Sequence, residues 1–325
     1  VTGTVNAGGG TNRLTYKFAS DATLGSAQTL PATFSVLGLD IASGATVTLD
    51  TGFAPQGLIT LSSPGSATLI NQASYTVAGP AFTQTYAYTP VAIDNRGALT
   101  VNLANPADTA ITMGQASFAN SGSIVVNGGN GVSQLGSYYG NYGQLSTNSG
   151  SITASATALD ISGAKLTNSG TLTSTAGTAL RLSGYTSGPS SNSGSISGAQ
   201  VGVDISYYRL INTGTIASPG TAVVLRSFGS LTNEASGVID GNIGAPTGSF
   251  TFGSTVTNGG RINGNVTVRN IHMGGAPSVP AACSSRGSTA SNASRIGPSS
   301  VWARQQCWSS DSRVGRLTST PRNAI

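Results

Sequence analysis

An asparagine-centred phrase recurs nine times in this chain of 325 residues, at intervals of 20 to 28 residues. An apolar residue usually stands two positions before the asparagine, a glycine two positions after it, and an apolar or aromatic residue four positions after it. The phrase indicates a corner between two strands, because glycine tolerates positive φ and asparagine can bond the turn or its counterpart in the next coil. The predicted corner asparagines are Asn71, Asn95, Asn120, Asn148, Asn168, Asn192, Asn212, Asn233 and Asn258.

A second phrase lies between these corners and aligns without gaps over four repeats. Its alternate apolar positions are expected to point inward, because successive side chains of a strand face opposite sides. The two inward columns are Leu159, Leu180, Val203 and Val223, and Ile161, Leu182, Ile205 and Leu225. Each period therefore holds at least two short strands, and a unit this short must stack on its neighbours to bury its apolar face.

The predicted fold class is all-β, a right-handed parallel β-helix of roughly ten coils of 20–28 residues each. Composition supports this class, because only 8% of the chain is charged, against about 25% in an average soluble domain. Helical repeats and coiled coils are excluded, since their exposed faces need Glu and Lys, of which the chain has one and two. The glycine-rich repeat that binds calcium is absent, so we expect neither a bound metal nor a cofactor.

Charge and composition divide the chain into three segments. Residues 1–35 are expected to form an N-terminal cap or first irregular coils, and residues 36–270 the β-helix. Residues 1–270 carry nine basic and nine acidic side chains, whereas residues 271–325 carry six Arg and one Asp, the whole excess of +5. The β-helix is therefore neutral, and we expect no nucleic-acid partner.

The basic segment 271–325 has three interpretations. It is a disordered tail, because it has too little apolar surface to offset its ordering entropy. Alternatively it is the product of a shifted reading frame, since the repeat stops abruptly, or it is a basic recognition tail. The chain also begins at Val1 without the basic and apolar regions of a signal peptide, so we expect a mature form or a fragment.

The repeated Asn-Ser-Gly-Ser-Ile and Asn-Thr-Gly-Thr-Ile corners, the absence of Cys before residue 271 and the neutral Ser/Thr/Asn/Gly surface resemble the adhesin-like passenger domains of autotransporters (type V secretion). The resemblance covers about residues 36–270. It implies export through both membranes of a Gram-negative bacterium, followed by display on the cell surface or release. It also implies a translocating outer-membrane β-barrel, for which this sequence holds no segments, so we expect a passenger truncated before its barrel.

Two sets of residues are candidates for a site. The outward column Asp160, Arg181 and Asp204 is either a carboxylate site or, as we favour, a ladder of alternating charges. We expect Arg181 to hold both carboxylates ionised, which does not suit a general acid. The tyrosines of the predicted loops either bind a sugar or protein or pack against the coils; they are Tyr138, Tyr139, Tyr142, Tyr185, Tyr207 and Tyr208.

These observations favour a non-catalytic passenger domain that acts in adhesion or surface display. Its expected partner is a host surface protein, a host glycan or a second copy on another cell. The alternatives are a carbohydrate-active β-helix enzyme, a lyase or glycosidase, and a purely structural spacer. The sparse charge of the body argues against the enzyme, because such a site needs a dense cluster of ionisable side chains on adjacent coils.

Overall fold

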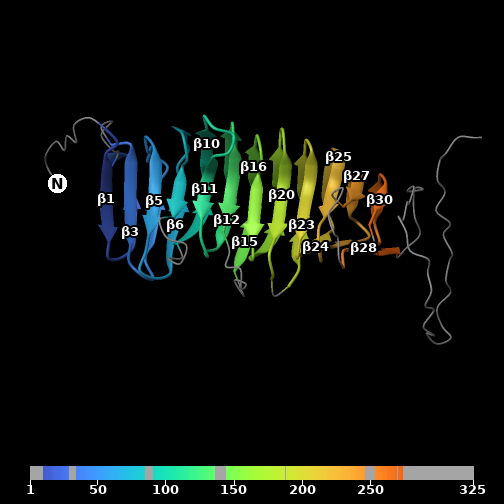
Figure 1. The fold of residues 1–325 in the computed structure, drawn as a ribbon. Helices are drawn as coiled ribbons and strands as arrows, with labels where there is room; N and C mark the ends of the chain where they lie inside the picture. The colour runs from blue at the N-terminus through green and yellow to red at the C-terminus, as the bar shows by residue number, and fades with distance from the viewer. Residues whose placement is uncertain are drawn as a thin grey trace, which may run out of the picture.

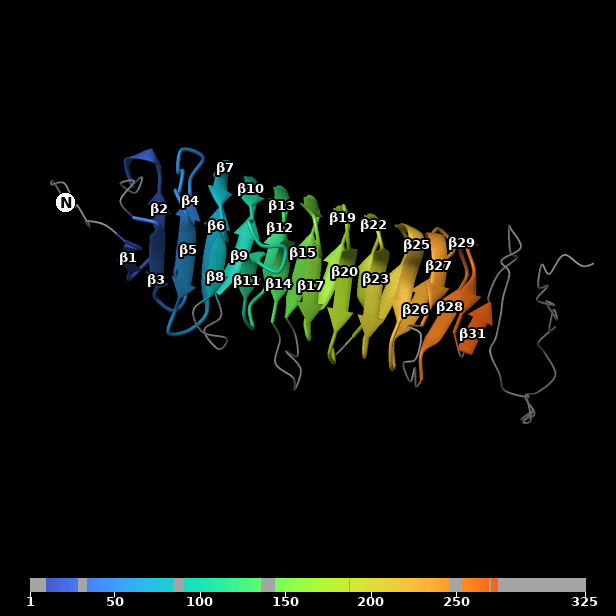
Figure 2. The same ribbon diagram turned by 45° about the horizontal axis from the view of Figure 1, so that its top comes forward.

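The structure, a computed structural model, describes residues 10–28, 34–84, 91–135, 144–186, 188–245, 253–268 and 270–273. These residues form one parallel β-solenoid of about ten turns with about 23 residues per turn. The coils are stacked in sequence order along one axis, from β1 at one end to β30 at the other (Figure 1), and a view turned by 45° shows the same order (Figure 2). The predicted solenoid and its number of coils are confirmed.

Each complete coil has three strands, one more than the minimum that the sequence required. Face 1 consists of β1 (Arg13–Phe18), β3 (Val36–Ile41), β5 (Leu58–Ser62), β8 (Phe82–Gln84), β11 (Thr109–Met113), β14 (Asn130–Gln134), β17 (Leu159–Ser162), β20 (Thr178–Ser183), β23 (Val201–Ser206) and β30 (Val266–Thr267). Face 2 consists of β2 (Ala22–Leu24), β4 (Thr46–Leu49), β6 (Ala67–Asn71), β9 (Val91–Asn95), β12 (Phe118–Asn120), β15 (Leu145–Asn148), β18 (Lys165–Asn168), β21 (Ser190–Asn192), β24 (Arg209–Asn212), β26 (Ser230–Asn233), β28 (Thr255–Asn258) and β31 (Asn270–Met273).

Face 3 consists of β7 (Tyr75–Ala78), β10 (Ala98–Asn102), β13 (Ser123–Asn127), β16 (Ser151–Ala154), β19 (Thr171–Ser174), β22 (Ser195–Gly198) and β29 (Arg261–Asn263). The long strands β25 (Thr215–Leu225) and β27 (Val238–Gly244) each continue from face 3 onto face 1 and join the two faces. The short 3-10 helix η1 (Ser26–Gln28) lies between β2 and β3.

The apolar columns stack in the register that the sequence alignment predicted. Leu159 of β17 is paired with Leu180 of β20, and Leu180 with Val203 of β23, all of them fully buried. Because parallel strands place equivalent residues directly above one another, each coil extends the same apolar column by one side chain. The core is therefore a continuous column along the solenoid.

The first described coil begins before residue 36, the expected start of the β-helix. Strand β1 is paired with β3 over six residues, and β2 with β4, so residues 13–24 already follow the solenoid pattern. At the other end β31 is paired with β28 and ends at Met273. Residues 274–325, nearly all of the basic segment, lie outside the described residues.

The nine corner asparagines form one continuous ladder of side-chain hydrogen bonds at the end of face 2. In each of the eight steps the Nδ2 atom donates to the Oδ1 atom of the asparagine in the next coil, at 2.7 or 2.8 Å. A second, longer bond from the same Nδ2 reaches the carbonyl oxygen of the residue at the turn, for example from Asn168 to Gly170 at 3.3 Å. The amides are thus paired inside the protein, as burial demands.

The ladder ends where the column changes residue type. Leu49 is in register with Asn71, and Met273 is in register with Asn258. Because Leu49 offers no donor, the buried Oδ1 atom of Asn71 has no hydrogen-bond partner. The first rung is therefore the least satisfied amide of the ladder.

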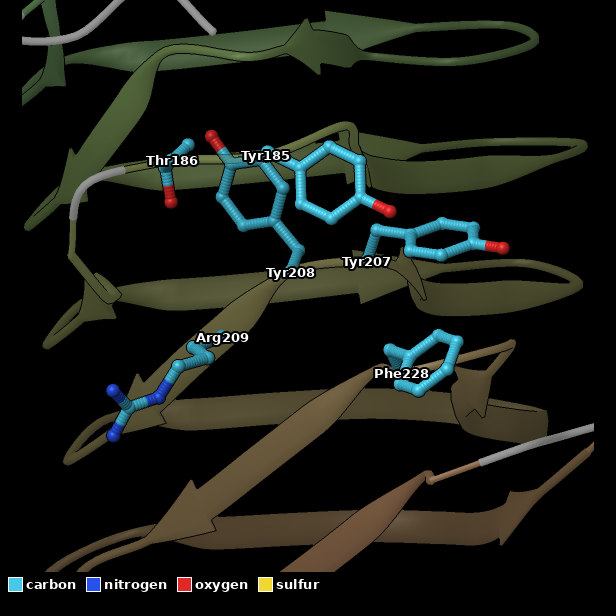
Figure 3. Close-up of a pocket in the computed structure, with 6 residues that line it drawn as sticks. All are labelled: Tyr185, Thr186, Tyr207, Tyr208, Arg209 and Phe228. Carbon is cyan, nitrogen blue, oxygen red and sulfur yellow. The ribbon is translucent and has the colours of Figure 1, made fainter. Parts of the chain in front are cut away.

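Two corners lack the apolar residue that usually precedes the asparagine, and each gap is filled by a side chain from elsewhere. Ser146 is fully buried, and its hydroxyl group donates to the Oε1 atom of Gln134 at 2.6 Å. Ser190 is fully buried in register with Leu210, and the ring of Tyr208 reaches back toward its coil (Figure 3). Larger side chains thus replace the missing core volume.

Replacing an interior rung should destabilise the solenoid strongly. In the Asn168→Ala variant, Asn148 loses its side-chain acceptor and Asn192 loses its donor, and each unpaired buried group costs about 1–3 kcal/mol. The control is Asn127→Ala, since Asn127 donates to Asn102 at a similar 2.8 Å but in an exposed position. Urea unfolding followed by circular dichroism should show a large loss only for Asn168→Ala; equal losses would contradict the importance of the buried ladder.

The Asn168→Asp variant should make stability depend on pH. A protonated carboxyl group can accept from Asn148 and donate to Asn192, as the amide does, whereas a buried carboxylate cannot donate. Burial should therefore raise the pKa of this carboxyl group in the folded state above its unfolded value, so stability falls as pH rises from the unfolded toward the folded pKa. Thermal unfolding at several pH values measures this effect. The melting temperature of the variant should lie nearest to that of the parent chain below about pH 4 and furthest from it at about pH 7; a difference independent of pH would contradict this account.

Candidate ligand-binding corner

The corners of the solenoid differ sharply in how much their length varies. At the asparagine corner, from face 2 to face 3, most connections have two residues, such as Ser149 and Gly150 between β15 and β16. The corner from face 1 to face 2, here called the variable corner, has connections from two residues, between β17 and β18, to ten residues, between β14 and β15. Insertions of a solenoid that gather on one side frequently mark its binding face.

Three exposed aromatic rings lie side by side on the variable corner, on three successive coils. Tyr185, Tyr207 and Phe228 are 54%, 37% and 55% exposed. The ring centroids of Tyr185 and Tyr207 are 5.2 Å apart, and those of Tyr207 and Phe228 are 5.4 Å apart. Figure 3 shows the three rings following one another along the solenoid. We call this set the aromatic ladder.

Two of these rings stand on a strained backbone. Tyr207 has φ of 56° and Phe228 has φ of 55°, and they are the only residues other than glycine with positive φ among those described. Each stands five positions before a corner asparagine, where other coils have Gly163 and Gly253, also with positive φ. The left-handed conformation costs a residue with a Cβ atom roughly 1–2 kcal/mol, and such strain is characteristic of functional sites.

The aromatic ladder borders a hollow of about 360 Å³, whose other lining residues are Thr186, Tyr208 and Arg209. Thr186 donates from its hydroxyl group to the carbonyl oxygen of Gly188, which holds the rim of this turn. Tyr208 lies beneath the ladder and is almost fully buried. Burial raises the pKa of its phenol above the usual range, and the neighbouring Ser190 hydroxyl opposes this shift.

The six tyrosines singled out in the sequence therefore separate into three groups. Tyr185 and Tyr207 lie together on the surface, whereas Tyr208 packs inward and offers a ligand no exposed area. Tyr138, Tyr139 and Tyr142 lie outside the described residues, within the connection from β14 to β15 at the same corner. The loop-packing interpretation thus fits Tyr208, and the surface-patch interpretation fits Tyr185 and Tyr207.

Phe228 belongs to the ladder but was missed in the sequence analysis, which considered only tyrosines. The repeat itself contains the signal, because Phe228 precedes Asn233 by the same five positions that separate Tyr207 from Asn212. Thr186 and Arg209 were missed for a different reason. Their place beside the rings depends on how the turns fold, which the spacing does not specify.

The charged column lies on face 1 and is formed of separate ion pairs. Asp160 is in register with Arg181, and Arg181 with Asp204. The Nη1 atom of Arg181 lies 3.5 Å from Asp160 Oδ2, whereas Asp204 pairs with Arg226, whose Nε and Nη2 atoms donate to its two carboxylate oxygens at 2.7 and 2.8 Å. The arrangement is bidentate, the strongest geometry for this pair, and Arg226 was not foreseen from the sequence.

Arg181 opposes a rise in the pKa of Asp160 but does not prevent it. Burial raises the pKa of Asp160 above its usual range, and the charge and hydrogen bond of Arg181 oppose this shift without cancelling it, while the charge of Asp204 adds to it. The physical reason is that only 29% of the Asp160 side chain is exposed to water, so desolvation outweighs one weak ion pair. Asp204 stays fixed by Arg226, so the two carboxylates are held in different environments.

No other chemical centre is evident in the described ranges. Within them, His, Cys, Asp and Glu side chains nowhere gather in the groups of three that hold a metal ion. No helix in the described part of the chain is long and apolar enough to cross a membrane. Comparison of the sequence and structure with protein-family models, curated proteins and solved structures found no match.

The left-handed backbone at Tyr207 should reverse the usual order of glycine and alanine variants. Because glycine adopts positive φ without steric cost, we expect Tyr207→Gly to be more stable than Tyr207→Ala by about 1 kcal/mol. Tyr185 lies outside the left-handed region and provides the control, since there alanine should be the more stable replacement. Denaturant unfolding of the four variants measures both differences; the same order at both positions would contradict the strain.

Proposed function

We propose that this β-solenoid is the passenger domain of an autotransporter-like protein, displayed on or released from a Gram-negative cell, and that it acts in adhesion without catalysis. The observation that carries the proposal is the concentration of exposed aromatic rings on the corner that also varies most in length. The partner is a host surface protein, a host glycan or a second copy of the chain.

The architecture suits a chain that is exported unfolded and folds at the surface. Every coil makes its contacts with its two neighbours, so folding can proceed coil by coil along the axis. Residues 1–270 contain no cysteine, so no disulfide can close within them before export. These features support the secretion route that the sequence resemblance implies.

The charged column is better explained as a stabilising element than as an active site. An inverting glycosidase needs one protonated carboxyl group and one carboxylate free to activate water. Asp160 is paired with Arg181, and both oxygens of Asp204 are occupied by Arg226. The column therefore lacks a free base, and we assign it to ion pairing between coils.

Adhesion can be tested with fluorescently labelled chain on cultured epithelial cells, measured by flow cytometry. We expect the triple variant Tyr185→Ala, Tyr207→Gly and Phe228→Gly to lose most binding, because it removes the three exposed rings. Glycine is chosen at positions 207 and 228 because other coils have glycine at the equivalent position of the turn, so the backbone conformation is preserved. The matched control is Leu145→Ser, which removes an exposed apolar side chain from face 2. A separate variant, Tyr138→Ala with Tyr139→Ala and Tyr142→Ala, measures how much of the cell binding depends on the connection between β14 and β15.

Undiminished binding of both aromatic variants would contradict adhesion through this corner. Sedimentation of the unlabelled chain over a range of concentrations distinguishes self-association from binding to the host cell. The purely structural spacer predicts no saturable binding by any of these chains.

The enzyme alternative has its own test. Incubating the chain with soluble polysaccharides and assaying new reducing ends should show no turnover above the level of an Asp160→Asn variant. Turnover that disappears in that variant would establish catalysis and overturn the assignment of the charged column.

A further inference from the structure

We infer that the aromatic ladder binds an uncharged glycan lying along the solenoid axis, with its sugar rings stacked on Tyr185, Tyr207 and Phe228. This inference rests on the proposed adhesive function and names the chemical class of its ligand. It follows from the spacing, the chemistry and the size of the hollow.

The spacing of the rings follows the stacking of the coils. Parallel strands lie about 4.8 Å apart, and the ring centroids of the ladder lie 5.2 and 5.4 Å apart. An extended polysaccharide advances by a comparable distance for each pyranose unit. A glycan parallel to the axis can therefore present successive sugars to successive aromatic rings, whereas a glycan across the axis meets one ring only.

The surface chemistry complements a sugar. Aromatic faces carry negative charge density and attract the weakly positive C–H groups that cover one face of a pyranose ring. All three rings line the hollow, and neighbouring rings are tilted relative to each other by 53° and 33°. Thr186 and Arg209 border the same hollow, and the Thr186 hydroxyl oxygen can accept a hydrogen bond from a sugar hydroxyl. The guanidinium group of Arg209 points away from the three rings (Figure 3).

Size and charge distinguish a glycan from the other partners. A hollow of about 360 Å³ lies in the range of small-molecule pockets, so it can hold a sugar unit. Among the described residues that line the hollow, Arg209 is the only cation, and Arg181 and Arg226 of the same coils are paired with carboxylates. The site therefore lacks the cluster of cations that an acidic ligand needs.

The backbone strain supports a ligand over packing as the reason for these rings. Tyr207 and Phe228 occupy positions where glycine serves in other coils, so the fold does not require a side chain there. An aromatic residue at such a position adds strain and leaves much of its ring in water. A sugar bound against the rings would cover this area.

Affinity gel electrophoresis of the whole chain tests the inference directly. The probes are hydroxyethyl cellulose and mannan as uncharged polysaccharides, and polygalacturonate as an acidic one. Each is tested at low salt and at about 0.5 M salt, which screens the charges on the protein surface. We expect retardation by an uncharged probe that persists at high salt. The apparent affinity should fall at least about tenfold in Tyr207→Gly and in Phe228→Gly, and remain in Tyr207→Phe, which keeps the ring.

Three results would overturn the inference. The first is that neither uncharged probe retards the chain. The second is that an uncharged probe retards the aromatic variants as much as the parent chain. The third is that the chain binds polygalacturonate alone, and that high salt or the Arg209→Gln variant abolishes this binding. Circular dichroism of each variant excludes loss of fold as the cause. If the cell-binding test succeeds through the ladder while both uncharged probes fail, the adhesive function stands and the glycan assignment falls; if both fail, the adhesive function falls as well.

Discussion

The fold depends on a buried row of amides that hydrogen-bond from coil to coil. An apolar column tolerates exchange among leucine, isoleucine and valine, so it leaves the register of the coils weakly defined. A buried asparagine defines the register more strictly, because a shift by one position leaves a buried donor and a buried acceptor unpaired. The eight Asn–Asn bonds therefore determine which residues lie above one another in the coils from Asn71 to Asn258.

Fixing one corner leaves another free to vary. The asparagine corner has a short turn in every coil, so each coil enters face 3 at the same point, whatever the length of its connection from face 1 to face 2. Insertions between β14 and β15, or between β27 and β28, return to the same ladder and leave the register intact. The buried asparagine ladder and the variable corner thus lie at opposite ends of the face 2 strands.

The sequence was informative wherever the deciding interaction recurs with the coil. The corner asparagines and the inward column that includes Leu180 are spaced by the coil itself, so the repeat revealed them. The pairing of Asp204 with Arg226 was not visible, because Arg226 lies just after its strand and reaches the column through its long side chain. The inward turn of Tyr208 was equally hidden, since it depends on the space that Ser190 leaves in the preceding coil.

The left-handed aromatic residues connect the fold to the proposed function most closely. A short turn after face 1 needs positive φ, and glycine at position 163 meets that need without strain. Tyr207 and Phe228 meet it at a cost of about 1–2 kcal/mol each. The two ring–ring contacts of the aromatic ladder return a comparable amount, about 0.5–1.5 kcal/mol each, so the rings add little net stability. The ladder of buried amides supplies the stability that permits this strain. A surface that binds through rigid rings gains from it, because the turn holds the side chains in place before the ligand arrives.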